Sequence, residues 1–283
     1  MSGVNYKDLV IKELNYSSYL KIPELLSLQQ ENSEPTHHDE MFFIIIHQTA
    51  ELWFKEVLHE TETLREFLRE GAVSRAMKVL KRIQAIMNLQ VKQIQLLSTL
   101  TPVEFAGFRN YLGKASGFQS AQYRIIEFTY GVRNRFFLQF FEKMPEIVQR
   151  LEKIQKEPSV YDECMLAMKA AGYPIPAAVL ERDVSQEWEV NQDLVQVIHD
   201  IYINPKEQYH WVLLFEAMLD LDMAITLWRK THAVMVSRTI GQKTGTGGSM
   251  GYAFLTSREN LKAFPELWEV RNIIGGSYQT GTE

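Results

Sequence analysis

The sequence predicts an all-α protein, and three observations carry that prediction. Its 15 glycines and 9 prolines together make 24 of 283 residues, about 8.5% against a usual share of about 12%, so turns are scarce. Apolar residues recur at steps of three and four over several long stretches, which is typical of amphipathic helices. No stretch of strict alternation is long enough to found a sheet. We therefore expect a single helical domain spanning residues 1–283.

The first long helix is expected over 39–70 and ends at Gly71. Its apolar stripe consists of Phe43, Ala50, Phe54, Val57, Leu64 and Leu68. A second helix is expected from Ser74, as N-cap, to Leu100, where Thr101-Pro102 interrupts it. Joined by a short turn, the two should pack antiparallel.

Further helices are expected after that pair. A short helical segment begins at Pro102, and 113–117 should form a loop. Longer helices are predicted over 119–130, 135–156, 159–171, 191–204 and 208–240. Residues 241–251 hold five of the 15 glycines, which indicates either a surface loop or backbone that approaches a ligand. The segment lacks both the Walker pattern and the dinucleotide fingerprint.

Charge and cysteine usage exclude whole classes of function. The 30 basic and 35 acidic residues give a net charge of −5 without a dense basic block, so we expect neither nucleic acid nor a membrane as partner. The longest apolar run, Met41–Ile46, is too short to span a bilayer, and no signal peptide precedes it, so a cytoplasmic protein is expected. Cys164 is the one thiol, so any metal must be held mainly by histidines or carboxylates.

Five of the seven histidines are weak candidates for a metal or acid–base site. His37 and His38 lie beside Pro35 at a helix start, where a solvated cap explains them, although a two-histidine iron centre with Asp39 stays open as a weaker alternative. Three more lack the spacing of metal ligands, and we assign no function to His59, His199 and His210.

The remaining two histidines fall on apolar stripes of long helices. His47 lies one turn from Phe43, and His232 lies one turn from Trp228. Each alone is more often a hydrogen-bonded core residue. Two such histidines, far apart in sequence, suggest haem held by a neutral histidine, with a second polar group on the distal side.

Arg109 stands in an aromatic setting, FAGFRNYLG (105–113). A guanidinium there needs a carboxylate or phosphate, since water would solvate it poorly. The partner is either an acidic residue of the chain or the anionic group of a substrate with an aromatic part, such as an aromatic amino acid.

Several stretches together resemble one family, the haem-dependent tryptophan 2,3-dioxygenases. They are EPTHHDEMFFIIIHQTAELWFKE (34–56), TPVEFAGFRNYLGKASGFQSAQYRIIEF (101–128), LWRKTHAVMVSRTIG (227–241) and KTGTGGSMGYAFL (243–255), with a weaker N-terminal echo at 14–29. The combination, in family order over nearly the whole chain, is highly specific.

The resemblance implies roles for residues around a haem. His232 would be the proximal ligand of a non-covalently bound haem b, and His47 the distal histidine near the bound dioxygen and the indole nitrogen. Phe43 would form an aromatic wall, and Arg109 would clamp the substrate carboxylate. Two further positions, Ser116 and Gly117, match residues that line the pocket.

The resemblance also implies mobile and shared parts of the site. Thr246, in the glycine-rich loop 241–251, would close over the amino-acid end of the substrate. Tyr16, in an N-terminal arm (1–35), would reach the site of a neighbouring subunit of an intertwined homotetramer. Phe105 departs from the family, in which tyrosine is common there; the phenyl ring keeps the wall but loses a hydroxyl donor, at a cost of about 1.5–3 kcal/mol in substrate binding.

The implied reaction uses ferrous haem and O2 to oxygenate the C2–C3 bond of L-tryptophan, giving N-formyl-L-kynurenine, the first step of tryptophan catabolism by the kynurenine route. Whether His47 is a base or only orients the substrate stays open. Phe105 motivates an alternative, a relative that oxygenates another indole or aromatic amino acid. A haem sensor without turnover is a further alternative, and without haem the chain would be a helical interaction module.

Overall fold

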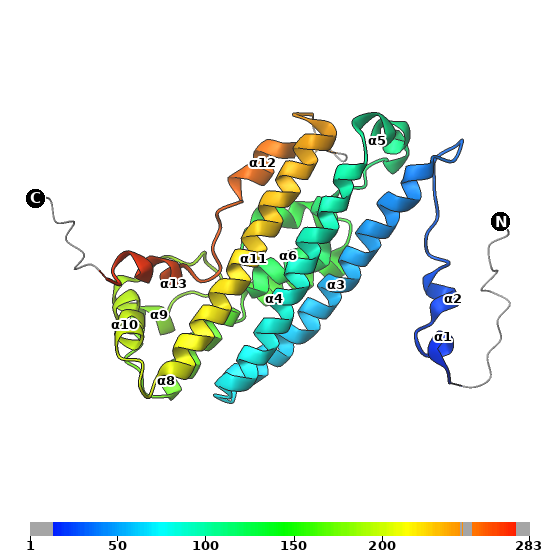
Figure 1. Cartoon of the computed structure of the whole chain (residues 1–283). Helices are drawn as coiled ribbons and strands as arrows, with labels where there is room; N and C mark the ends of the chain where they lie inside the picture. The colour runs from blue at the N-terminus through cyan, green and yellow to red at the C-terminus, as the bar shows by residue number, and fades with distance from the viewer. Residues whose placement is uncertain (1–13, 244, 246–250, 276–283) are drawn as a thin grey trace, which may run out of the picture.

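A computed structural model describes residues 14–243, 245 and 251–275, and that part of the chain is all-α, with no strand. Three long helices lie side by side (Figure 1): α3 (His38–Arg69), α4 (Val73–Gln95) and α11 (Tyr209–Ile240). The middle helix, α4, packs against both of the others. The all-α prediction is confirmed.

The antiparallel pairing of α3 and α4 follows from a short turn and a polar tie. Gly71 adopts a φ of 68°, which favours glycine, and reverses the chain. At the other end Gln93 donates to the carbonyl of Ile46 at 2.7 Å, which joins the end of α4 to the start of α3. The expected N-cap at Ser74 is wrong: Ala72 occupies that position and Ser74 lies inside the helix. The helix starts earlier because its buried stripe begins at Val73.

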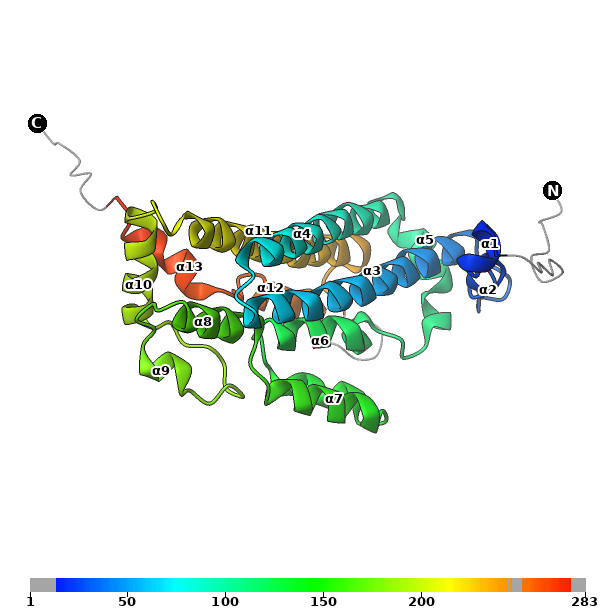
Figure 2. The same ribbon diagram turned by 90° about the horizontal axis from the view of Figure 1, so that it is seen from below.

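Beyond these helices, α6 (Ala121–Thr129) and α8 (Val160–Ala170) pack along α3, and α7 (Pro145–Gln155) lies outside α6 (Figure 2). The single helix expected over 135–156 is wrong. A 3-10 segment, η5 (Arg135–Phe141), precedes α7, and Met144 between them has φ −128° and ψ 70°. Pro145 causes the break, because proline disfavours the helical conformation in the residue before it.

Shorter elements complete the chain. The helix predicted over 102 onward is α5 (Pro102–Arg109), and the one predicted over 191–204 is α10 (Gln192–Ile203). The remaining elements, with at most seven residues each, are α1 (Tyr16–Tyr19), α2 (Ile22–Leu25), η2 (Leu96–Thr99), η3 (Asn110–Leu112), η4 (Gly117–Gln119), α9 (Ala177–Leu180), α12 (Gly251–Ser257), α13 (Pro265–Glu269) and η7 (Val270–Asn272). No helix of the described residues has the length and apolar content needed to cross a bilayer.

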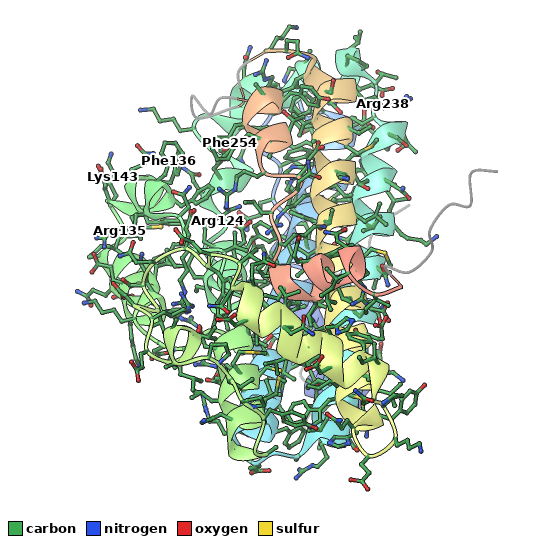
Figure 3. All side chains as sticks on the ribbon, turned by 90° about the vertical axis from the view of Figure 1, so that its left-hand side faces the viewer. Arg124, Arg135, Phe136, Lys143, Arg238 and Phe254 are labelled. Carbon is green, nitrogen blue, oxygen red and sulfur yellow. The ribbon has the colours of Figure 1, made fainter. Side chains whose placement is uncertain are left out.

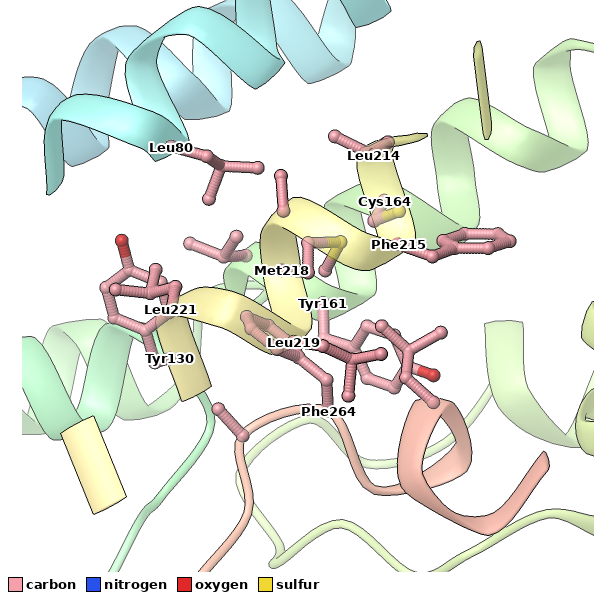
Figure 4. Packing of buried hydrophobic residues seen from close by; sticks show 14 of the residues in the cluster. Leu80, Tyr130, Tyr161, Cys164, Leu214, Phe215, Met218, Leu219, Leu221 and Phe264 are labelled. Atoms are coloured by element: carbon pink, nitrogen blue, oxygen red, sulfur yellow. The ribbon is translucent and has the colours of Figure 1, made fainter. Parts of the chain in front are cut away.

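The main core surrounds the first half of α11 (Figure 4). Phe215, Met218 and Leu221 of α11 pack there with Tyr161 of α8 and Phe264, all 0–1% exposed. Burial of large side chains at this density accounts for much of the stability of the fold. The second half of α11 instead faces a cavity, so one end of the long helices is solid and the other is hollow.

Candidate active site

A cavity of about 270 Å³ lies between the second half of α11, the first half of α3 and the second half of α4. Residues of α5, α6 and α12 complete its walls, so segments far apart in the sequence meet there. Its lining is mainly aromatic and aliphatic with a few polar groups, as in sites that bind small molecules. It brings together seven of the residues that the sequence predicted, namely Phe43, His47, Phe105, Arg109, Ser116, Gly117 and His232.

The hydrogen bond of His47 determines its tautomer. Its Nδ1 lies 2.7 Å from the carbonyl oxygen of Phe43, one turn earlier in α3. A carbonyl can only accept, so Nδ1 carries the hydrogen and Nε2 keeps its lone pair. Desolvation lowers the pKa of His47, against opposing effects of its hydrogen bond to Phe43 and of Glu51, so the ring is neutral near pH 7. The Phe43 ring lies 4.1 Å from the imidazole, between centroids.

His232 is the matching histidine on α11. Burial lowers its pKa to about 4, helped by the nearby His47 and Arg124. Its ring lies 5.2 Å from that of Trp228. A neutral imidazole beside aromatic walls has the chemistry that a haem iron needs from an axial ligand. The cavity residues therefore fit a haem, with the buried Nε1 of Trp228 left without a hydrogen-bond partner among the described residues.

The alternative iron centre at the start of α3 is not formed. His37 caps that helix, accepting a hydrogen bond from the backbone N–H of Asp39 at 3.4 Å. Within the described residues no group of three or more histidine, cysteine or carboxylate side chains could hold a metal ion. The helix cap predicted for His37 is thus confirmed. The alternative iron site with His38 and Asp39 is not found among the described residues.

Arg109 lies at the end of α5, where it reaches the cavity near Ser116 and Gly117. Two features fix α5 against α3. Phe105 packs on Phe43, with centroids 5.7 Å apart. Glycine at position 107 leaves room for the His37 ring, since a Cβ there would lie 2.4 Å from Nε2 of His37. The approach of α5 thus sets both the aromatic wall and the position of the guanidinium.

Two predicted residues are not brought into this cavity by the described chain. Tyr16 is 77% exposed on α1, which lies on the side of α3 away from α4 and α11 (Figure 1). Thr246 lies outside the described residues. Gly245 and Gly251, on either side of it, line the cavity.

Sequence reasoning missed a group of charged residues on the cavity wall: Arg124, Glu127, Arg229 and Arg258. Glu127 is 3% exposed and binds Arg124 Nη1 at 2.5 Å and Arg229 Nη2 at 3.1 Å. The available signal was the position of Arg124 and Glu127 within the apolar helix 119–130. Charged residues are almost never fully buried unless they are paired, so two charged residues within an apolar helix indicate a buried ion pair.

Comparison with known proteins agrees with this geometry. The family model described as tryptophan 2,3-dioxygenase matches residues 5–156 and 139–274. A tryptophan 2,3-dioxygenase of Arthrobacter sp. (strain FB24) is 44% identical over 272 residues, which cover 95% of this chain and 96% of that protein. Those of Rhodococcus jostii (strain RHA1) and Serratia proteamaculans (strain 568) are 44% and 41% identical, over 95% and 93% of this chain and 96% and 94% of theirs. The chain belongs to the tryptophan 2,3-dioxygenase family.

Proposed function

We propose that this chain is a haem-dependent dioxygenase that inserts both atoms of O2 across the indole C2–C3 bond of L-tryptophan. The product would be N-formyl-L-kynurenine, at the first step of tryptophan catabolism by the kynurenine route. One observation carries the proposal: two neutral histidines from different long helices line one aromatic cavity that Arg109 also reaches. Membership of the family supports the same reaction.

His232 would hold the iron of a non-covalently bound haem b, because its neutral ring offers a lone pair. When bound in its ferrous form, the haem supplies the activation of dioxygen. The protein supplies orientation and a dry environment.

His47 would bind the indole. Since its Nδ1–H is committed to the carbonyl of Phe43, its Nε2 is the nitrogen available to accept the indole N–H. Such an acceptor orients the ring, and it can also take the proton, which keeps both roles open for His47.

Arg109 would clamp the carboxylate of the amino acid, because a guanidinium forms two parallel hydrogen bonds with it. Phe43 and Phe105 would hold the indole from the sides. Ser116, Gly117 and, in the loop 241–251, Thr246 would enclose the amino-acid end and exclude water.

The whole chain would act as one haem-binding domain in a homotetramer, in which the arm 1–35 lends Tyr16 to a neighbouring site. The large exposed fraction of Tyr16 in its own chain supports that arrangement. A cytoplasmic location stays a prediction from the sequence.

The test is a visible spectrum of the protein expressed with a supply of haem. Wild type should show a Soret band, His232→Ala should lose or shift it, and His210→Ala, an exposed histidine on the same helix, should leave it unchanged. A wild-type spectrum without a Soret band, or one indifferent to His232→Ala, would refute the proposal.

A substrate assay separates the remaining candidates. Formylkynurenine should form from L-tryptophan, whereas a relative with another substrate would act on D-tryptophan, substituted tryptophans or tyrosine instead. A haem sensor would bind haem but consume no oxygen on addition of substrate. Arg109→Ala should weaken the binding of L-tryptophan far more than that of tryptamine, which lacks the carboxylate. Equal losses of affinity for the two compounds would contradict the clamp.

A further inference from the structure

Four charged residues form a basic cluster on the wall of the cavity: Arg124, Glu127, Arg229 and Arg258. Arg124 and Glu127 belong to α6, Arg229 follows Trp228 on α11, and Arg258 follows α12. The cluster lines the same cavity as His232, the proposed iron ligand. Figure 3 shows Arg124 with Phe136 and Phe254 on one flank of the long helices.

One carboxylate serves three guanidinium groups in this cluster. Glu127 lies 2.5 Å from Arg124, 3.1 Å from Arg229 and 3.8 Å from Arg258. The arginines lower the pKa of Glu127, so it is ionised. Three positive charges and one negative charge leave an excess of two positive charges. The other acidic residue on the cavity wall, Glu51, receives a hydrogen bond from Gln122 at 2.8 Å.

The three arginines are not equally satisfied. Arg229 also donates to the Tyr123 hydroxyl at 3.3 Å and to the Leu261 carbonyl at 2.9 Å. By contrast, Nε of Arg124 and Nη2 of Arg258 are buried without a hydrogen-bond partner among the described residues.

The two under-satisfied side chains are only 9% and 13% exposed, for Arg124 and Arg258 respectively. Their guanidinium carbons lie 4.0 Å and 4.9 Å from the centroid of the Phe137 ring. An aromatic face contributes little beside the cost of burying a cation, and the unmatched N–H groups call for anionic oxygens.

We propose that Arg124 and Arg258 bind the two propionate carboxylates of the haem, an assignment that rests on the function proposed above. A dianion with a flat apolar body matches both the excess of two positive charges and the aromatic cavity beside it. The substrate carboxylate does not compete for this place, because Arg109 would take it. Arg124 and Arg258 are then the residues that set which way the haem edge points.

The experiment titrates the haem-free protein with haem and with haem dimethyl ester, whose propionates carry no charge, and follows the Soret band. Wild type should bind haem about 100-fold more tightly than the ester. Arg124→Gln and Arg258→Gln should each lose about tenfold for haem, which corresponds to about 1.4 kcal/mol, and little for the ester. Arg238→Gln, an exposed arginine on α11, is the matched control and should change neither affinity.

Two further variants keep the test decisive if the Gln variants fold poorly. Arg124→Lys keeps the charge and should retain most of the preference for haem over its ester. Glu127→Gln removes the competing carboxylate, so this preference should persist or increase. If the cluster is only structural, haem and ester affinities fall together in all these variants, and that result would overturn the assignment. Absence of haem binding by wild type would refute the proposed function itself, a distinct outcome.

Discussion

The hydrogen bond from His47 to the Phe43 carbonyl has consequences for pH. A helix carbonyl is a fixed acceptor, so the imidazole can present only Nε2 to a ligand without losing that bond. Protonation of Nε2 would turn the acceptor into a donor and would place a charge in a poorly solvated cavity. The neutral form is therefore both the favoured and the useful form.

The pH profile should show this directly. Because burial lowers the pKa of His47, the group is neutral above its ordinary pKa of 6.5 and gains a proton only at lower pH. We expect kcat/KM for L-tryptophan to be constant above pH 6.5 and to fall as the pH drops below that value. His47→Ala should be about 10²-fold slower or more if the ring is a base, and its profile should lack this acid limb. An acid limb centred at pH 7 or above would contradict the assignment.

Substitution of Phe105 by tyrosine should improve the binding of L-tryptophan. Its ring is 8% exposed, lines the cavity and touches Phe43. In Phe105→Tyr the new hydroxyl should donate to the substrate carboxylate and lower KM for L-tryptophan about tenfold, in line with a hydrogen bond to a charged group. Tryptamine serves as control and should show no gain. An unchanged KM for L-tryptophan would mean that the hydroxyl does not reach the carboxylate.

The length of each helix decided whether the sequence could predict it. The helices α3, α4 and α11 are each longer than six turns, so their stripes are unambiguous, and all three were predicted. Short helices such as α9 and α12 have too few residues to show a period. The error over 135–156 has a local cause in Pro145, which the apolar pattern of the surrounding phenylalanines obscured.

One carboxylate of α11, that of Asp222, holds the C-terminal segment 263–268 through two donors. Asp222 accepts from Trp268 Nε1 at 2.8 Å and from the backbone N–H of Ala263 at 3.2 Å, and it is 1% exposed. Asp222→Ala leaves both donors buried and unpaired, so the free energy of unfolding should fall by about 2–4 kcal/mol. Chemical denaturation measures this. Asp220→Ala, at an exposed position of the same helix, should stay within about 0.5 kcal/mol of wild type. Equal effects of the two substitutions would contradict the attachment.

At the scale of the whole molecule, the N-terminal segment is notable for large apolar side chains that the rest of the described chain leaves uncovered. Leu14, Tyr16 and Tyr19 are 82%, 77% and 71% exposed, respectively. Large apolar side chains gathered on one exposed segment mark a surface that a partner covers. A second copy of the chain is the partner that the proposed homotetramer provides.

Removal of residues 1–27 should therefore change the assembly before it changes the fold. We expect a smaller species in sedimentation and a raised KM for L-tryptophan, with the Soret band retained because His232 is untouched. Tyr16→Ala should raise KM without changing the mass, whereas Tyr209→Ala, at an exposed position of α11 (56%), should alter neither. A truncated chain with unchanged mass and unchanged KM would contradict the shared site.

The sequence by itself determined the helical class, the three long helices, the positions of His47 and His232 on apolar stripes, and the family resemblance. It could do so because these properties are periodic or local. The tertiary structure alone decided that Arg124, Glu127, Arg229 and Arg258 share one wall and that Gly107 lies close to the His37 ring. A stripe shows which side of a helix is buried but not which other segment it meets. Contacts between residues about 100 positions apart depend on how whole helices pack.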